Sequence, residues 1–492
     1  MRPSYFRAAL LVSFTLASAT AAEAQSTATL TVSPTVAPPT GTLTAQGSGF
    51  GASETVKIDF GSTELQTVTA DTNGGWGPVP VTVPQTAVPG PYSLVAIGET
   101  SHESARKQVV VRTDWPMGGF DLARSHYNPY ENVLNVANAP SLAPLWSVTA
   151  GGWVRASPVE ASGIAYIGTQ HDNVQAYNAS TGVRSWTQRL GGSSAINSTA
   201  AIVSGALYVG STNGTLYAFN AANGAQLWAV PTGGEISNSP LEVDNLVYSV
   251  SLATGERATL YAYAASNGAV VWSQYLGNVP AGYGKNGPTL GNGEVLTPYS
   301  IFSSPSYADG LLYIGSGDGY VYAFNATTGA QVWAAQTNNW VNATPTVDSG
   351  TVYCGSWDGN FYAWSAQTGA LLWQVPLNGV IESSAAVANG VVYVGSADHS
   401  LYALDAATGA TLWTATTDDV IGASPAVANG VVYIGSFDDG MYALNAATGA
   451  KLWSHATTFF IEASASVVNG ILYVASMDGS FAAFSVNGVP PP

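Results

Sequence analysis

Eight variable positions between residues 155 and 462 carry the side chains best suited to bind a ligand. Each follows an aliphatic residue, in the segments VRAS, INST, ISNS, IFSS, VNAT, IESS, IGAS and IEAS. The positions are Arg155, Asn197, Ser237, Phe302, Asn342, Glu382, Gly422 and Glu462. The carboxylate and amide oxygens among them suit a calcium ion, with Glu382 and Glu462 as its charged ligands. The guanidinium of Arg155 suits the oxygens of a bound molecule.

Aromatic residues lie two positions before three of these residues, where they are able to stack on a flat ligand. They are Trp153, Trp340 and Phe460. Glu382 or Glu462 would also serve as a general base, and nothing in the sequence chooses between base and metal ligand. A set of this composition also arises by chance at variable positions around a water-filled channel, so both interpretations stay open.

These positions belong to a repeat of about 40 residues, whose clearest copy is VVYVGSADHSLYALDAATGATLW, residues 391–413. Eight tryptophans mark the copies: Trp146, Trp186, Trp228, Trp272, Trp333, Trp373, Trp413 and Trp453. Eight tyrosines repeat in step with them, from Tyr166 to Tyr473. Short apolar runs separated by Gly and Asp turns at this period are typical of a β-propeller. We therefore expect an all-β protein with eight blades, whose symmetry places the eight variable positions around one mouth of a central channel.

The tryptophans also predict how the ring closes. The last repeat ends near Gly488 without a tryptophan, whereas Trp146 precedes the first complete repeat and has no inner strands of its own. We expect the strand around Trp146 to become the outer strand of the last blade, because such closure leaves no exposed sheet edge between the two ends of the ring.

The N-terminal part differs from the repeats. Residues 1–24 contain two arginines, an apolar stretch and the sequence AEA before Gln25, which predicts a cleavable secretory signal and a periplasmic or extracellular protein. Residues 27–112 alternate apolar and polar residues between Pro and Gly turns, which predicts a small β-sandwich. The propeller is expected over residues 113–488, beginning with the irregular segment DWPMGGFDLARSHYNPYENVL.

Composition limits the possible partners. The chain has 13 Lys+Arg against 30 Asp+Glu, a net charge of −17, which disfavours nucleic acid and anionic membrane surfaces. No later stretch approaches the roughly 20 apolar residues of a membrane helix. The single cysteine, Cys354, excludes an intrachain disulfide framework, and the five histidines show no metal-ligand spacing.

The repeat, with YVGS, then DG, then LYALDAATG and LW, resembles the pyrroloquinoline-quinone (PQQ) propeller repeat of quinoprotein alcohol dehydrogenases and of the outer-membrane assembly propellers. The resemblance covers residues 113–488 and implies that each tryptophan packs on the neighbouring repeat as a docking girdle. The segment GSGFGASETVKIDFG with ADTNGGW and VPGPYSLVA resembles bacterial immunoglobulin-like modules.

Departures from that family determine the functional hypotheses. One cysteine and no CxxCH motif exclude the adjacent-cysteine disulfide and the haem domain of the best-known quinoprotein dehydrogenases. The leading hypothesis is a non-catalytic binding or scaffold protein that uses the channel face. The alternative is a PQQ- and calcium-dependent alcohol dehydrogenase, in which Arg155, Asn197, Asn342, Glu382, Glu462, Trp153 and Trp340 bind the cofactor. A third is a cell-surface adhesion or scaffold protein attached through its sandwich.

Two further features have both a functional and a structural interpretation. The interval between Trp272 and Trp333 is about 20 residues longer than the others, and its insertion, residues 275–300, is a candidate lid or partner-binding loop or a tolerated insertion. The aspartates between the second and third strands suggest calcium, but Asp-Gly is also the preferred tight-turn pair, and we favour turns. These are Asp172, Asp318, Asp358, Asp398, Asp438 and Asp478.

Overall fold

The computed structural model describes residues 28–491 except 192–193, 254–256 and 279–302. The chain divides into two compact units: unit 1 contains the residues up to Thr35, Thr42–Thr82 and Pro91–Val109, and unit 2 contains Val36–Gly41, Val83–Gly90 and the chain from Val110 on. The described residues contain strands and a single 3-10 turn, η1 (Ala139–Ser141), which confirms the predicted all-β class. None of their helices is long and apolar enough to cross a membrane. The predicted secretory signal lies outside the described residues.

The N-terminal strands form two sheets. The first has the order β1 (Thr29–Ser33), β3 (Thr42–Ser48), β6 (Trp76–Thr82). The second has the order β2 (Val36–Ala37), β8 (Ser104–Val111), β7 (Gly90–Gly98), β4 (Thr55–Phe60), β5 (Thr63–Thr69). Alternate residues of β4, among them Val56 and Ile58, are fully buried, as the alternating sequence predicts. The immunoglobulin-like character of this part stays a prediction.

Within the described residues of unit 2 there are eight sheets, the number that the tryptophans predict, and their strands pair antiparallel except for the short parallel pairing of β9 (Tyr127–Asn128) with β36 (Ala426–Ala428). We number them in chain order. The first four are sheet 1, β11 (Val159–Ala161), β12 (Ile164–Gly168), β13 (Asn173–Asn178), β14 (Arg184–Arg189); sheet 2, β15 (Ala201–Val203), β16 (Ala206–Ser211), β17 (Thr215–Asn220), β18 (Gln226–Pro231); sheet 3, β19 (Gly234–Glu235), β20 (Leu241–Val243), β21 (Leu246–Ala253), β22 (Arg257–Ala264), β23 (Val270–Asn278); and sheet 4, β24 (Ser306–Ala308), β25 (Leu311–Gly315), β26 (Tyr320–Asn325), β27 (Gln331–Gln336).

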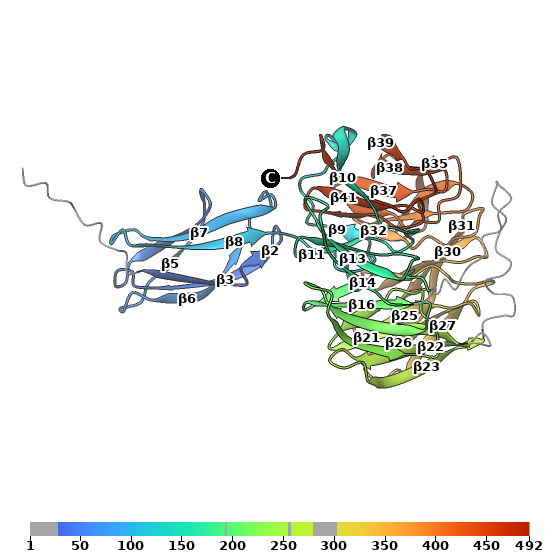
Figure 1. Cartoon of the computed structure of the whole chain (residues 1–492). Coiled ribbons are helices and arrows are strands. Elements are labelled where there is room, and N and C mark those ends of the chain that lie inside the picture. The colour runs from blue at the N-terminus through green and yellow to red at the C-terminus, as the bar shows by residue number, and fades with distance from the viewer. Residues whose placement is uncertain (1–27, 192–193, 254–256, 279–302, 492) are drawn as a thin grey trace, which may run out of the picture. The chain divides into compact units, whose positions relative to one another are not determined.

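The remaining sheets complete the unit (Figure 1). They are sheet 5, β28 (Thr346–Asp348), β29 (Thr351–Gly355), β30 (Asn360–Ser365), β31 (Leu371–Pro376); sheet 6, β32 (Ala386–Ala388), β33 (Val391–Gly395), β34 (Ser400–Asp405), β35 (Thr411–Thr416); sheet 7, β36 (Ala426–Ala428), β37 (Val431–Gly435), β38 (Gly440–Asn445), β39 (Lys451–Ala456) and β9 (Tyr127–Asn128); and sheet 8, β40 (Ser466–Val468), β41 (Ile471–Ala475), β42 (Ser480–Val486), β10 (Leu142–Thr149).

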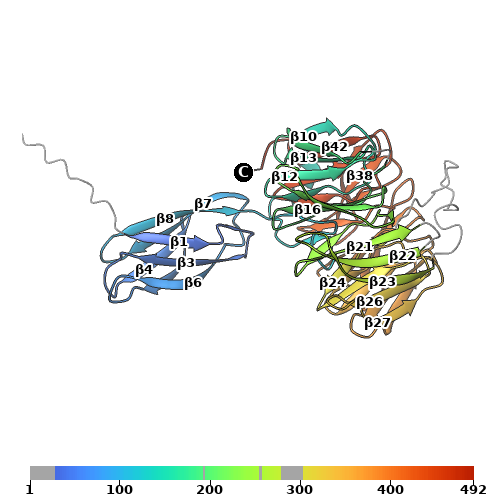
Figure 2. The same cartoon turned by 60° about the horizontal axis from the view of Figure 1, so that its bottom comes forward.

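Sheet 8 joins the two ends of unit 2. Strand β10, from the start of the unit, pairs antiparallel with β42, the last strand (Figure 2). In this pairing Trp146 lies opposite Ala483. This pairing confirms that the strand around Trp146 is the outer strand of the last sheet. The indole Nε1 atoms also link the sheets into a circle: each donates to a backbone carbonyl of the next repeat at 2.8–3.1 Å, and Trp453 completes the circle on Leu142. The docking girdle implied by the family resemblance is therefore present.

A second circle of hydrogen bonds lies on the segments leading into the inner strands. Each member donates its backbone N–H to the side-chain hydroxyl of the equivalent residue in the next repeat, at 2.9–3.1 Å, and the eighth returns to the first. We call this set the hydroxyl ring. Its members are Ser157, Thr199, Ser239, Ser304, Thr344, Ser384, Ser424 and Ser464. A closed circle of this kind requires all eight inner segments to surround one axis.

The segment before the first sheet lies across the far ends of the inner strands. Its backbone carbonyls accept hydrogen bonds from inner-strand N–H groups that follow the variable positions by five residues, such as Val347 to Ala123 and Val387 to Ser125. The buried guanidinium of Arg124 donates to the carbonyls of Pro240 and Pro305, at 3.1 Å each. Since a strand rises about 3.3 Å per residue, this segment lies at the opposite end of the channel from the variable positions.

Candidate functional site

The structure brings the predicted variable positions into one cavity at the channel mouth. A cavity of about 160 Å³ is lined by hydroxyl-ring residues and by seven of the eight positions, whereas Phe302 lies outside the described residues. The seven are Arg155, Asn197, Ser237, Asn342, Glu382, Gly422 and Glu462. They meet because each enters its inner segment at the same register, two residues before the hydroxyl ring.

An ion pair lies on one side of this cavity. The Nε of Arg155 is 3.0 Å from Oε2 of Glu462, and the two side chains are 17% and 18% exposed. Both atoms are enclosed, and neither has a hydrogen-bond partner of suitable angle among the described residues. The two charges therefore compensate each other, but the contact does not have the geometry of a hydrogen bond.

The pKa of Glu382 depends on the same two side chains. Burial and the negative charge of Glu462 raise the pKa of its carboxyl, Arg155 and a hydrogen bond from the Trp357 side chain lower it, and the net value is about 7. Near neutral pH this carboxyl is thus divided between its protonated and ionised forms. A group of this kind is able to donate a hydrogen bond, accept one, or take up a proton.

The other polar lining residues are also engaged with protein groups, with one exception. Oδ1 of Asn197 accepts from Nε2 of Gln170 at 3.4 Å, and Asn342 is 3% exposed. The enclosed hydroxyl of Ser237 has no hydrogen-bond partner in the described part of the chain.

Aromatic side chains surround part of the mouth. Trp153, 54% exposed, stacks on Phe459, 39% exposed, with ring centroids 6.4 Å apart. The contacts continue from Phe459 to Phe460 and from Phe460 to Phe437, at 4.7 Å each. We call these four residues the aromatic arc. The predicted Trp340 lies apart from it, 4.9 Å from Trp357.

Sequence reasoning missed three of these aromatic residues. Phe459 precedes the predicted Phe460, while Phe437 and Trp357 each precede a hairpin aspartate. An aromatic residue directly before Asp438 or Asp358 was a usable signal, because that hairpin opens at the same end of the sheet as the variable positions.

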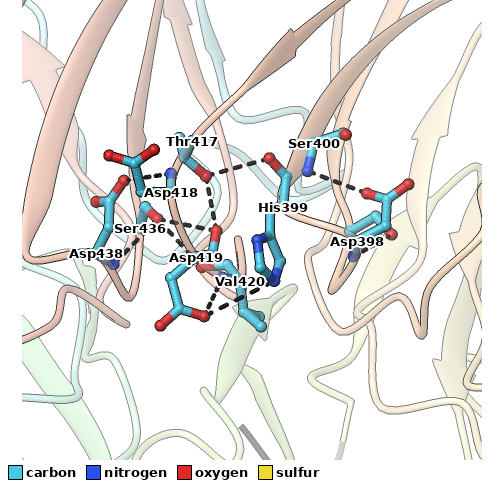
Figure 3. A network of polar contacts seen from close by, with 10 residues as sticks. Asp398, His399, Ser400, Thr417, Asp418, Asp419, Val420, Ser436 and Asp438 are labelled. Atoms are coloured by element: carbon cyan, nitrogen blue, oxygen red, sulfur yellow. Dashed lines mark hydrogen bonds and ion pairs between the residues drawn. The ribbon is translucent and has the colours of Figure 1, made fainter. Parts of the chain in front are cut away.

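The hairpin aspartates serve as turn residues, as favoured from the sequence. Asp398 accepts from the N–H of Ser400 (Figure 3) and from the hydroxyl of Tyr402. Asp438 accepts from the N–H of Gly440 and from the hydroxyl of Tyr442 in the same way. Between these hairpins His399 Nε2 lies 4.0 Å from Asp419 Oδ1. The described residues contain no group of three or more His, Cys, Asp or Glu side chains arranged to hold a metal ion.

Two other predicted features contribute little to the described site. The insertion begins as the end of β23, and the rest of residues 275–300 lies outside the described residues. Cys354 is buried in β29, and burial raises the pKa of its thiol well above the usual value, so that the thiol is unreactive.

Comparison with known proteins identifies relatives of unit 2. A family model described as outer membrane protein assembly factor BamB matches residues 129–204, 192–300, 259–380 and 357–488. A quinohemoprotein alcohol dehydrogenase of Comamonas testosteroni is 30% identical over 101 residues, which are 20% of this chain and only 14% of that protein.

Solved structures share the fold at low identity. The quinohemoprotein alcohol dehydrogenase of Comamonas testosteroni matches with a TM-score of 0.62 and 17% identity, over 77% of this chain and 82% of the other. A europium-containing methanol dehydrogenase matches with 0.62 and 16%, over 74% and 89%. BamB from Moraxella catarrhalis matches with 0.57 and 20%, over 70% and 99%. At these identities the likeness extends to the fold alone.

Proposed function

Because the family match runs from residue 129 to residue 488, the chain belongs to the PQQ-like propeller family that the BamB model represents, and we propose that it is a non-catalytic binding protein. In this proposal a protein or polymer partner lies on the channel mouth of unit 2. The chain acts after export, in the periplasm or outside the cell, in keeping with its predicted secretory signal.

The observation that carries this proposal is the aromatic arc. Trp153 and Phe459 expose large apolar rings side by side at the mouth of the cavity. Exposed aromatic groups with rigid neighbours are characteristic of the centre of binding surfaces. Phe460 and Phe437 support Phe459 from behind, so that the exposed rings are held in place before a partner arrives.

The residues of the cavity do not fit a PQQ–calcium pair well. Calcium takes about six to eight oxygen ligands, but here Glu462 is paired with Arg155, Glu382 accepts from Trp357, and Asn197 accepts from Gln170. The cavity of about 160 Å³ is also smaller than the roughly 300–1,000 Å³ typical of small-molecule sites. The donor set therefore supports polar contacts to a partner more than enclosure of a cofactor.

One observation favours the alternative, a PQQ-dependent alcohol dehydrogenase. The pKa of Glu382 near 7 suits a general base that would accept the hydroxyl proton of an alcohol, and PQQ would supply the hydride acceptor. The alternative is tested directly by incubating the protein with PQQ and Ca²⁺, removing free cofactor, and measuring retained quinone absorbance and dye reduction with simple alcohols. We expect neither retained absorbance nor dye reduction. Retention of one PQQ per chain together with alcohol-dependent dye reduction would contradict the binding proposal and support the dehydrogenase.

The binding proposal is tested with a photo-crosslinking amino acid at position 153. Its matched control is the same amino acid at Leu412, which is 53% exposed on the outer strand of sheet 6, away from the channel. We expect a discrete crosslinked partner from cells that produce the position-153 protein and none from the control. The partner should be lost when Phe459→Ser is added, and equal crosslinking at both positions would contradict the proposal.

A further inference from the structure

A second cavity lies between sheets 6 and 7, outside the channel. It measures about 400 Å³ and shares no lining residue with the channel cavity. Its floor is formed by the buried side chains of Leu401, Ile421, Ile434 and Leu444. Its rim is polar and comprises Thr414, Thr416, Thr417, Asp418 and Lys451. We call it the 6–7 cleft.

The repeat itself explains why the cleft is open here. Sequence alignment gives the residues equivalent to Ala415 and Leu444 at each junction. They are the residue two positions after the tryptophan of one repeat and, in the third strand of the next repeat, the residue after the alanine that lies opposite the tryptophan of that sheet. The pairs are Val148 with Tyr177, Gln188 with Phe219, Val230 with Tyr263, Gln274 with Phe324, Ala335 with Trp364, Val375 with Leu404, Ala415 with Leu444, and His455 with Phe484. Ala415 and Leu444 form the smallest of these pairs.

Elsewhere a small residue is matched by a large one. Ala335 packs in one cluster with Trp364, and His455 stacks edge-on against Phe484 with ring centroids 4.7 Å apart. Protein interiors are otherwise close-packed, so a junction that lacks this compensation leaves a void. The 6–7 cleft is this void, and it opens to the surface through its polar rim.

One positive charge stands on the rim. Nζ of Lys451 lies 5.6 Å from the ring centroid of Tyr442, and no carboxylate oxygen of the described residues is within ion-pair distance of it. Lys451 is the one lysine that the structure describes in unit 2 of this strongly acidic chain. Asp418 is on the rim as well, but it follows the end of β35, whereas Lys451 begins β39 opposite Leu444.

We infer that the 6–7 cleft binds a small organic carboxylate with an apolar body. The carboxylate pairs with Lys451, and the apolar body lies on Ile421, Ile434 and Leu444. The volume of the cleft lies within the roughly 300–1,000 Å³ of small-molecule sites, and its apolar floor below a polar rim offers a matching surface to each part of such a ligand. This site is independent of the proposed partner surface at the channel mouth.

The test uses the full chain and 4-phenylbutyrate, with 4-phenylbutanol as its uncharged analogue, by isothermal titration calorimetry. We expect saturable binding of 4-phenylbutyrate with one site per chain. The affinity for 4-phenylbutanol should be lower by about tenfold or more, because the alcohol lacks the charge-assisted contact. Absence of saturable carboxylate binding at millimolar ligand would overturn the inference.

Two variants locate the binding. Lys451→Gln copies the residue at the equivalent position Gln331, and we expect it to weaken 4-phenylbutyrate about tenfold without changing the affinity for the alcohol. Leu444→Trp copies the Ala335 and Trp364 pair, fills the cleft, and should abolish binding of both compounds. Unchanged affinity in Lys451→Gln would overturn the inference even if Leu444→Trp failed to fold.

A matched control opens a similar cleft without the lysine. Val375→Ala gives the junction of sheets 5 and 6 an alanine–leucine pair, and its rim carries Thr411 where the 6–7 cleft has Lys451. We expect this variant to bind one 4-phenylbutyrate per chain, as the wild type does. A second carboxylate site of similar affinity would show that the void alone suffices and would contradict the role of Lys451.

Discussion

The Nε of Arg155 lies 3.0 Å from Oε2 of Glu462, although 307 residues separate them in the chain. The contact exists because sheet 8 returns to the start of unit 2, so that the segment before β40 lies beside the segment before β11. Beside them the hydroxyl ring closes at the same junction, from Ser464 to Ser157. Closure of the ring therefore brings these two opposite charges together at the channel mouth.

Glu382 should make stability depend on pH. Its folded-state pKa of about 7 lies above the usual 4.5, so the folded state binds this proton more tightly. The contribution is fully present below pH 4.5 and is lost as pH rises through 7. Glu382→Gln should therefore match the wild type at pH 4 and be more stable at pH 8, by about 3 kcal/mol, in urea unfolding.

Glu462→Gln is the control for that experiment. Because the charge of Glu462 raises the pKa of Glu382, its removal should move the pH-dependent step of the wild-type curve to lower pH. A difference between Glu382→Gln and the wild type that stayed constant from pH 4 to pH 8 would contradict the assignment.

Glu160 should show a larger effect of the same sign. It is 1% exposed, and burial, with Asp114 nearby, raises the pKa of its carboxyl from 4.5 to about 8. Its stabilisation is present below pH 4.5 and disappears as pH rises through 8. Glu160→Gln should retain the acceptor for the Gly163 N–H and stabilise the protein by about 5 kcal/mol at pH 9, with no gain at pH 4.

The thermal midpoint of Glu160→Gln against pH checks this, with Asp114→Asn as its companion. Loss of the neighbouring charge should shift the wild-type midpoint curve toward lower pH. If Glu160→Gln were less stable than the wild type at pH 9, the folded protein would stabilise the ionised carboxyl, the pKa of Glu160 would not be raised, and the prediction would be wrong.

Removal of one hydroxyl-ring acceptor should destabilise unit 2. Ser384→Ala leaves the N–H of Thr344 without its acceptor, which is 2.9 Å away in the wild type. The expected cost is about 1 kcal/mol in denaturant unfolding, since an unpaired donor in a half-buried site loses its hydrogen bond. Ser384→Thr keeps the hydroxyl, as Thr199 and Thr344 do in the same ring, and should retain wild-type stability. Equal loss in both variants would assign the effect to packing instead.

Loss of β10 should destabilise unit 2 by more than the loss of the contacts of a single strand. Deletion of residues 143–149 removes the outer strand of sheet 8 and the indole hydrogen bond from Trp146 to Ala179. We expect a fall in melting temperature of more than about 10 °C. Without β10 the edge of β42 is unpaired, and the two ends of unit 2 are no longer joined. Trp146→Phe, which removes the indole N–H while retaining an aromatic ring, should cost about 1 kcal/mol. A deletion variant with the wild-type melting temperature would refute closure by this strand.

Much of the architecture was predictable because it is periodic. The tryptophan spacing gives the number of sheets, and the absence of a tryptophan after Phe484 identifies the strand around Trp146 as the closing one. The variable positions could be aligned for the same reason: equal register in every repeat brings Arg155, Glu382 and Glu462 to one mouth. The turn role of aspartates such as Asp398 followed from local backbone chemistry.

What only the tertiary structure decided concerns contacts between repeats. The sequence named Glu462 and Arg155 as separate ligands, but their side chains form an ion pair that changes the charge available at the mouth. Phe459 stacks on Trp153, which is far from it in the sequence and belongs to the first repeat. The void beside Ala415 depends on which residue of the next sheet it faces, and the burial of Arg124 depends on where the leading segment crosses the inner strands. A repeat pattern specifies strands and register by local spacing, whereas side chains meet across a junction only after the ring has closed and each sheet has packed on the next.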